Sequence, residues 1–371
     1  MAGLYIHIPF CKSRCIYCGF FSTTRMELRQ RYVDAVISEA KVRTTDDAIE
    51  TVYLGGGTPS QLTTPQLQQL FDGLYNIYKV AADAEVTLEC NPDDVTPDFA
   101  EALKTLPVNR VSMGTQTFDD TRLRFLHRRH TSAQVSQAVE RLRNAGISNI
   151  SIDLMYGFPE ETLDDWQHDI DAALALSVNH ISAYCLMIEE GTALYQQMTS
   201  KGTEDLDHRN EELEREMYYL LIDRLEAAGY EHYELSNFAR PGLRSRHNNS
   251  YWTDVPYIGL GAAAHSYDGQ QRRWNADDLA IYIRGIENGH PESESEPIDA
   301  TTHYNDRVML SLRTCEGLDL TTLSPQDTAY LLPLAKRYLD DGLLTVSGNH
   351  LSLSRQGLFV SDMIMADLMR V

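Results

Sequence analysis

The stretch "FCKSRCIYCGFF", Phe10–Phe21, holds three of the six cysteines of this 371-residue chain. Cys11, Cys15 and Cys18 follow the apolar segment 4–9, whose pattern predicts a β-strand. Thiolates grouped in this way bind zinc or an iron–sulfur cluster. The other three cysteines lie singly in apolar segments, which is not the arrangement of a disulfide framework. The sequence therefore predicts one metal-binding loop in a protein of a reducing compartment.

The choice between zinc and a cluster rests on the number of ligands. A structural zinc site usually takes four ligands, often as two separate pairs. No second C-x2-C pair is present, and the alternation of the expected strand alone accounts for His7. Three cysteines on one loop suit a [4Fe-4S] cluster better, because the fourth iron then stays open to a non-protein ligand. We predict a [4Fe-4S] cluster and keep zinc as the alternative.

Strand-like and helix-like segments alternate through the first two-thirds of the chain. Strands are expected at 4–9, 51–57, 85–90, 110–116, 149–157 and 180–186, and helices at 27–43, 64–78, 132–145 and 162–176. Repeated alternation of this kind predicts an α/β fold with a parallel sheet and crossover helices. Rolled up, such a sheet forms a full or partial (β/α) barrel.

The remainder of the chain has a different pattern. A long charged amphipathic helix is expected at 206–228, and two further helices precede a hairpin at 343–354. Helices followed by a two-stranded wing predict a small winged-helix-like domain at the C-terminus. The expected parts are a barrel at 1–235, a connecting region at 236–295 and the C-terminal domain at 296–371.

Charge and hydropathy exclude some functions. The formal net charge is −22, which argues against nucleic-acid binding, where a basic face supplies most of the affinity. No stretch approaches 18 uninterrupted apolar residues, so we expect no transmembrane helix. The first ten residues also lack the basic and apolar segments of a secretory signal. These features predict a cytoplasmic protein.

Polar and glycine residues follow several of the expected strands, where a β/α barrel carries its functional groups. Gly55–Pro59, "GGGTP", follows the second strand. Together with C-x3-C-x2-C after the first strand, it resembles the radical S-adenosylmethionine superfamily. In that superfamily the open iron binds the amino and carboxylate groups of S-adenosylmethionine. The glycines would let the backbone approach the methionine portion of this cofactor.

A closer resemblance runs over residues 3–270 and into the C-terminal domain. It is carried by "YIHIPFC", "YLGGGTPS", "LECNPDD", "SMGTQTF", "IDLMYGFPEET", "HYELSNFA" and "YIGLGAAAHSY". In combination these resemble the oxygen-independent coproporphyrinogen III dehydrogenase family. The resemblance implies a partial (β/α)6-type radical S-adenosylmethionine barrel with a small C-terminal helical, winged-helix-like domain.

The resemblance also implies a set of cofactor-binding residues. The positions that match the S-adenosylmethionine site are Tyr5, Tyr17, Gly56, Gly57, Thr58, Glu89, Gln116, Arg128 and Asp153. Glu89 matches an acidic residue that meets the amino or hydroxyl groups of the cofactor. His127 stands where the family usually has a glycine, which makes Arg128 the least secure member of the set.

Two features separate this chain from the dehydrogenases. The dehydrogenases have a motif that resembles C-x3-C-x2-C-x-C. In this chain Phe20 occupies the position of the fourth cysteine, and only ten residues precede Cys11. "HNNSYW", 247–252, is similar to the HNxxYW motif of the haem-chaperone branch of the family, the HemW proteins. His247 is then the expected ligand to haem iron, with His265 as a second candidate. On these six residues alone, the alternative is a loop held by local hydrogen bonds.

The resemblance implies a haem chaperone that binds a [4Fe-4S] cluster, S-adenosylmethionine and haem. It would deliver haem to haem-requiring apoproteins such as respiratory enzymes, and the sequence leaves open whether it is also an enzyme. The alternative is a radical enzyme that oxidatively decarboxylates coproporphyrinogen III. A third possibility is another porphyrin-modifying radical enzyme, such as a haem-degrading methyltransferase. The oligomeric state is open.

Overall fold

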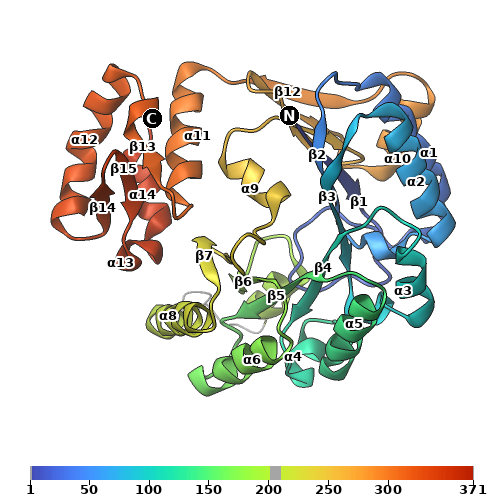
Figure 1. Cartoon of the computed structure of the whole chain (residues 1–371), viewed down its shortest axis with the longest axis horizontal. Helices are drawn as coiled ribbons and strands as arrows, with labels where there is room; N and C mark the ends of the chain where they lie inside the picture. Colours follow the sequence, from blue (N-terminus) through green and yellow to red (C-terminus); the bar gives the residue numbers. More distant parts are fainter. Residues whose placement is uncertain (1, 201–209, 371) are drawn as a thin grey trace.

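A computed structural model describes residues 2–200 and 210–370 of the chain (Figure 1). Its main feature is a 12-stranded sheet with the order β12-β11-β10-β9-β1-β2-β3-β4-β5-β6-β8-β7. Six successive parallel strands form the middle of the sheet. They are β1 (Ala2–Ile8), β2 (Ile49–Gly56), β3 (Val80–Cys90), β4 (Arg110–Gln116), β5 (Asn149–Tyr156) and β6 (His180–Cys185). The predicted parallel α/β sheet is confirmed.

Helices cover the outer side of these strands (Figure 1). They are α1 (Arg29–Val42), α2 (Thr64–Ile77), α3 (Pro97–Leu103), α4 (Asp120–Phe125), α5 (Ser132–Asn144), α6 (Leu163–Ala175) and α8 (Glu211–Ala227). Helix α7 (Ala193–Ser200) packs instead beside the cysteine loop, where Leu194 is buried with Ile16. In α2, for example, Leu67, Leu70, Phe71 and Leu74 are buried, which is one helical stripe packed on the sheet. Thr63 and Gln66 form a capping box that starts this helix. The part of the expected helix at 206–209 lies outside the described residues.

The two faces of each strand differ in chemistry. In β1, Leu4, Ile6 and Ile8 belong to the hydrophobic core beneath the helices. Tyr5 and His7 alternate with them and face the inner side, because successive side chains of a strand point to opposite faces. The inner side of the curved sheet is therefore a polar and aromatic lumen, and the functional site can form there.

Residues 236–295 contribute to the same sheet instead of only connecting two parts. β8 (Asn237–Ala239) pairs with β6, and β9 (Tyr257–Leu260) pairs with β1. β10 (His265–Tyr267), β11 (Gln271–Asn275) and β12 (Ser293–Pro297) extend the β9 side, and β7 (Glu231–Glu234) lies at the other edge. Within the described residues the strand order ends at β12 and β7, and no strand pairing closes the sheet into a full barrel. Helix α10 (Leu279–Glu287) packs on α1.

The C-terminal domain has its own hydrophobic core. It contains α11 (Ala300–Leu312), α12 (Pro325–Asp340), α13 (Arg355–Leu358), α14 (Ser361–Leu368) and a three-stranded sheet of β13 (Leu318–Asp319), β15 (His350–Leu353) and β14 (Leu344–Ser347). The predicted helices and hairpin are present. The expected boundary at 296 falls inside β12, which still belongs to the large sheet.

Helix α9 (Arg246–Trp252) lies between the sheet and the C-terminal domain (Figure 1). It contacts β2 on one side and α11 on the other. Backbone bonds tie the domain to the sheet nearby, with Leu235 N–H donating to Arg313 O at 3.1 Å and Cys315 N–H donating to Tyr233 O at 3.0 Å. The "HNNSYW" segment is thus a helix at the junction of the two parts, and not the loop that was the alternative interpretation of these six residues.

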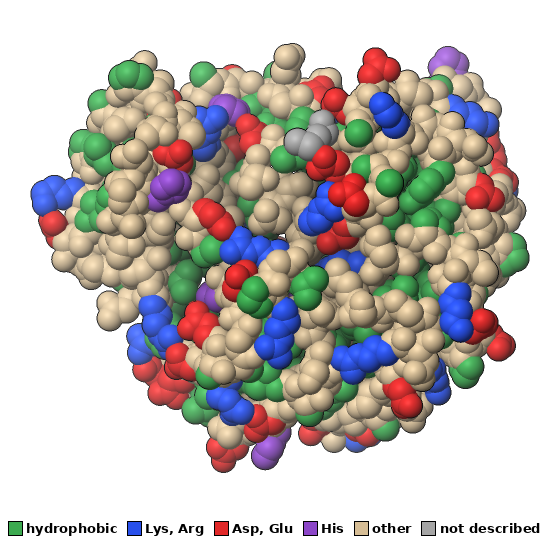
Figure 2. Space-filling view, in the orientation of Figure 1, with side chains coloured by type: hydrophobic (Ala, Val, Ile, Leu, Met, Phe, Trp, Pro, Cys, Tyr) green, Lys and Arg blue, Asp and Glu red, His purple; other side chains and the backbone are tan. Residues whose placement is uncertain are grey.

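On the face of the molecule in Figure 2, acidic and basic side chains are interspersed. Within residues 2–200 and 210–370, no helix has both the length and the apolar character needed to cross a membrane.

Candidate cluster and cofactor site

The cysteine loop leaves the carboxyl end of β1 and is pinned to the barrel by its backbone. Cys11 N–H donates to Thr23 O at 2.9 Å, and Thr23 N–H donates to Pro9 O at 2.7 Å, which closes the base of the loop. Ile16 is 3% exposed and bonds through its backbone to Leu126 and Leu194. The apolar anchor at Ile16 therefore holds the loop over the rim of the sheet.

The three thiols lie close enough to influence one another. Burial raises the pKa of Cys11 and Cys18, and the neighbouring cysteines raise the pKa of both further. Among residues 2–200 and 210–370, no group of three or more His, Cys, Asp or Glu side chains is compact enough to hold a single metal ion. A cube-shaped cluster binds each thiolate to a different iron, so it does not need such a compact group. The loop fits a cluster, whose irons would hold the half-buried thiols as thiolates.

A chain of hydrogen bonds crosses the ends of three strands between two of these cysteines. Cys11 Sγ lies 3.4 Å from Thr58 Oγ1, which accepts from Asn91 Nδ2 at 3.4 Å. Arg128 Nη2 donates to Asn91 Oδ1 at 2.7 Å, and its Nη1 donates to Cys15 Sγ at 3.5 Å. The structure thus brings Thr58 and Arg128 to the cysteine loop, and it adds Asn91, which the predicted set does not include.

The backbone conformation of His127 is one that favours glycine, the residue that the family resemblance implies at this position. Its φ is 59°, in the left-handed region that L-residues rarely adopt. Immediately afterwards Arg128 N–H donates to Leu123 O at 2.9 Å, so the chain reverses at the end of α4 and directs Arg128 to the cysteines. The histidine therefore forms this turn at the cost of backbone strain.

Replacing His127 by glycine should stabilise the protein. A non-glycine residue in the left-handed region costs about 1–2 kcal/mol, and the greater flexibility of glycine in the unfolded chain offsets roughly 0.5–1 kcal/mol of this. We expect His127→Gly to raise the free energy of unfolding by about 0.5–1 kcal/mol, measured by urea unfolding. His127→Ala keeps the strain and is the control. Equal stability of the two variants would contradict this explanation.

Packing within the protein requires the glycines of the turn at the end of β2. Gly56 has φ 106°, and a Cβ atom there would lie 2.5 Å from the His7 ring. A Cβ atom on Gly57 would lie 2.6 Å from the backbone carbonyl carbon of Pro9. We expected these glycines to let the backbone approach a cofactor. They also let the end of β2 pack closely against the start of the cysteine loop.

Two carboxyl groups face the lumen below this turn. Glu89 accepts from Tyr53 OH at 2.7 Å and from Gly56 N–H at 3.1 Å. Burial raises the pKa of Glu89 to about 7 and that of Asp153 to about 6. The carboxylate of Asp153 adds to the effect of burial and raises the pKa of Glu89 further. Perturbed carboxyl groups in a lumen are typical of functional sites.

The remaining predicted residues lie at the rim or deeper in the lumen. Gln116 ends β4 with φ 70°, a strained conformation at a register shift between β4 and β5. The hydroxyl of Tyr5 lies 3.0 Å from His7 Nδ1, and its ring stacks on Tyr53 with centroids 6.2 Å apart. Tyr17 packs against a small hydrophobic cluster beneath the cysteine loop.

Arg110 is a lumen residue that the sequence did not reveal. It is 1% exposed, and its Nε and Nη1 atoms have no hydrogen-bond partner within the described part of the chain. Its positive charge lowers the pKa of both Glu89 and Asp153, which opposes the effect of burial. Buried charges are normally paired, so this guanidinium acts on the carboxyl groups through space. An arginine at the start of a strand gives no sequence signal for such a position.

His247 lies at the floor of the lumen. It is 1% exposed, with Nδ1 2.7 Å from Thr51 Oγ1 and Nε2 2.9 Å from Tyr251 OH. Burial lowers its pKa to about 3, so the ring is neutral. Both ring nitrogens therefore have protein partners, and iron ligation would require one of these bonds to break. The assignment of His247 to haem iron stays a prediction that this arrangement does not favour.

Family comparisons agree with the fold. The Radical SAM superfamily model matches residues 5–173, and the HemN C-terminal domain model matches residues 298–360. The solved structure of coproporphyrinogen III oxidase (HemN) from Escherichia coli superposes with a TM-score of 0.84 at 22% identity, covering 99% of this chain and 90% of that one. It shares the fold. The fold and the cysteine loop thus define a radical S-adenosylmethionine protein.

Relatives with assigned names identify the family within this superfamily. The haem chaperone HemW of Bacillus subtilis is 34% identical over 375 residues, covering 98% of this chain and 97% of its own length. The HemW proteins of Mycobacterium tuberculosis H37Rv and Escherichia coli K12 are also 34% identical over 375 residues, covering 99% and 98% of this chain and 94% and 97% of their own lengths. The chain belongs to the HemW family.

Proposed function

We propose that this protein is a haem chaperone of the cytoplasm. It binds haem, a [4Fe-4S] cluster and S-adenosylmethionine, and it passes haem to apoproteins such as respiratory enzymes. The observation that carries the proposal is similarity to proteins named haem chaperone HemW over 98% of this chain. Phe20 supports it, because the position that resembles a fourth cysteine in the dehydrogenases carries an aromatic ring that is 70% exposed.

In this proposal Cys11, Cys15 and Cys18 hold the cluster at the rim. The cluster, when bound, supplies an open iron for the amino and carboxylate groups of S-adenosylmethionine and an electron for its chemistry. The cofactor then lies against the residues that the family resemblance implies, namely Tyr5, Tyr17, Gly56, Gly57, Thr58, Glu89, Gln116, Arg128 and Asp153. Arg128 and Thr58 orient the loop, and Glu89 accepts a hydrogen bond from an amino or hydroxyl group of the cofactor.

The competing function is oxidative decarboxylation of coproporphyrinogen III. One sample separates the two: the full chain with its cluster reconstituted anaerobically, then titrated with haem. The same sample is supplied with S-adenosylmethionine, a reductant and coproporphyrinogen III, and assayed for deoxyadenosine and protoporphyrinogen.

We expect saturable haem binding at one site and no protoporphyrinogen. Transfer is then tested by mixing the haem-loaded protein with a haem-free cytochrome and following the change in the haem spectrum. Turnover of coproporphyrinogen III, or failure of the reconstituted protein to bind haem, would overturn the proposal.

A further inference from the structure

The C-terminal domain lies over the open side of the large sheet. Within the described residues the strand order ends at β12 on one edge and at β7 on the other. At the first edge, Asp306 of α11 pairs with Arg272 of β11. At the second edge, Cys315 N–H donates to Tyr233 O of β7 at 3.0 Å. The domain therefore spans the gap between the two edges, with α9 between it and the sheet (Figure 1).

A single short segment joins this domain to the sheet. Strand β12 ends at Pro297 and α11 begins at Ala300, and no later strand of the described chain joins the large sheet. Pro297, Asp299 and Ala300 are exposed. A domain that is attached at one place turns about this place when its other contacts break. Residues 297–300 are therefore the hinge of the domain.

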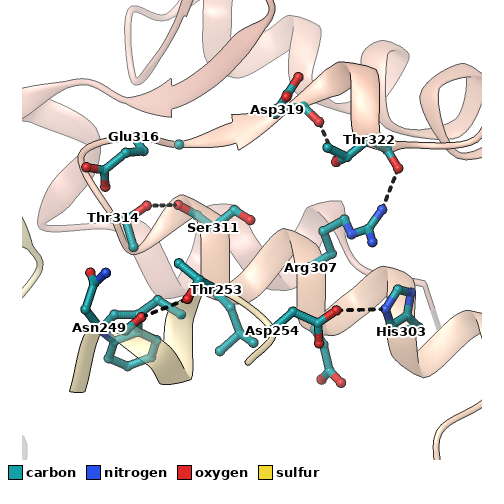
Figure 3. Close-up of a pocket in the computed structure, with 14 residues that line it drawn as sticks. Asn249, Thr253, Asp254, His303, Arg307, Ser311, Thr314, Glu316, Asp319 and Thr322 are labelled. Carbon is teal, nitrogen blue, oxygen red and sulfur yellow. Dashed lines mark hydrogen bonds and ion pairs between the residues drawn. The ribbon is translucent and has the colours of Figure 1, made fainter. Parts of the chain in front are cut away.

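The interface between the domain and the rest of the protein has little apolar packing. The buried apolar side chains of the domain form a core that is separate from the main core. Leu358 and Phe359 pack against the main core, but both are only partly buried. Between α9 and α11 the interface leaves a cavity of about 420 Å³, whose polar lining includes Asp254, Glu316 and Asp319 (Figure 3). Rigid interiors have few voids larger than a water molecule, so this interface is suited to separation of the two parts.

Ion pairs fasten the domain on the side away from β12 (Figure 1). Arg355 of α13 donates to both carboxylate oxygens of Asp223 in α8, at 2.7 and 2.9 Å. Its guanidinium also lies 4.9 Å from the centroid of the Tyr219 ring. Arg244 donates to Glu316 at 2.6 Å. The side chains of Arg355 and Asp223 are 45% and 61% exposed, so water readily replaces their contact. We call these two ion pairs the latch.

We propose, on the basis of the proposed function, that the C-terminal domain is a lid that admits haem to the lumen. When the latch opens, the domain turns about residues 297–300 and α11 moves away from α9. A flat macrocycle then reaches the lumen through the gap between β12 and β7. With the lid closed, lumen residues such as Arg110 and His247 are each 1% exposed. Helix α9 stays with the sheet, because Glu85 of β3 accepts from the backbone N–H groups of Arg246 and His247 at 3.0 Å.

The first test is hydrogen exchange of the full chain, followed by mass spectrometry. The N–H groups of Leu235 and Cys315 donate across the interface, so their exchange reports opening of the lid. We expect Asp223→Asn to speed this exchange about two- to fivefold, the range that one exposed ion pair contributes. Added salt should speed it in the parent and have a smaller effect in the variant. The amides of β1 and β2 should exchange as in the parent, which shows that the barrel stays folded.

Asp171→Asn is the matched control. Asp171 of α6 pairs with Arg224 of α8, so this variant loses an ion pair of the same helix without touching the lid. It should exchange as the parent does. Arg355→Gln should repeat the effect of Asp223→Asn from the other side of the latch. Arg355→Lys keeps the charge but loses the two parallel bonds, so its exchange should lie between that of the parent and that of Arg355→Gln.

The second test is the rate at which the full chain takes up haem, followed by stopped-flow absorbance. If the lid opens before haem enters, this rate is proportional to the open fraction of the protein. Asp223→Asn should then raise the association rate by the same factor as the exchange rate. The control Asp171→Asn should take up haem as fast as the parent.

The outcomes separate this inference from the proposed function. Equal exchange at Leu235 and Cys315 in the parent and in Asp223→Asn, with and without added salt, would show that the latch does not hold the domain. Faster exchange with an unchanged rate of haem association would show that haem does not enter past the lid. Either result overturns the inference, although haem binding by the parent keeps the proposed function. If the parent binds no haem, the proposed function fails and the lid loses its assigned role with it.

Discussion

The Cys15→Ser variant should contain almost no iron–sulfur cluster after anaerobic reconstitution, and it should not bind S-adenosylmethionine. Cys15 is one of three thiols on a loop whose base is closed by backbone bonds between Cys11, Thr23 and Pro9. A serine oxygen is a poor ligand for iron in such clusters, and two cysteines cannot hold the cube in this loop. Arg128 also loses the sulfur atom to which its Nη1 donates at 3.5 Å. Iron and sulfide content and the visible absorbance measure the result.

Cys315→Ser is the matched control for this experiment. Cys315 is an exposed thiol near Arg244, far along the chain from the cysteine loop. This variant should retain the full iron content of the parent. If Cys15→Ser keeps its iron, the loop is not the cluster site. If the parent takes up zinc in preference to iron under the same conditions, the zinc alternative replaces the cluster.

Much of the fold follows from local sequence patterns. Apolar residues at 67, 70, 71 and 74 mark the buried stripe of α2, and the alternation of apolar and polar residues in 4–8 marks β1. Because these signals depend on neighbours in the chain, the parallel sheet and its helices could be predicted. The extension of the sheet by residues 257–297 could not, since its strands have only three to five residues each and β12 is exposed along its whole length.

The residues at the rim of the site could also be predicted from the sequence, but those inside the lumen could not. Cysteines and glycines at the ends of strands are visible in the sequence because their spacing is local. Arg110, however, acts on Glu89 and Asp153 only because β3, β4 and β5 lie side by side. Helix α9 shows a similar limit. Ser245 accepts from Asn248 N–H and caps this helix, a signal that could have predicted it, but no local pattern shows that His247 turns into the lumen.

The binding of S-adenosylmethionine should depend on pH through Glu89. The pKa of Glu89 is raised to about 7 by burial, so the carboxyl group is mostly protonated below this value and ionised above it. An ionised carboxylate accepts hydrogen bonds from the amino or hydroxyl groups of the cofactor more strongly than a protonated one. The affinity should therefore rise as the pH rises from 6 to 8, measured by isothermal titration of the reconstituted protein.

The stability of the protein without the cofactor should change with pH in the opposite direction. The folded protein holds the proton more tightly than the unfolded chain, so it loses stability as the pH rises from the usual carboxyl range through about 7.

Glu89→Gln and Arg110→Met test this explanation from two sides. The glutamine keeps the size of the side chain but cannot ionise, so we expect an affinity about 10–100-fold lower at pH 8, from the loss of a charge-assisted hydrogen bond, and a flat pH profile. Arg110→Met removes the cation that lowers the pKa of Glu89 and Asp153, so the rise in affinity should remain but shift to higher pH. Glu85 bonds to backbone N–H groups of α9 and lies lower in β3, so Glu85→Gln is a control that should leave the pH profile unchanged. A parent profile that is flat between pH 6 and 8, or a Glu89→Gln variant that keeps the slope, would show that Glu89 does not contact the cofactor. A slope that Arg110→Met leaves at the same pH would show instead that the buried guanidinium is balanced by another anion in the lumen.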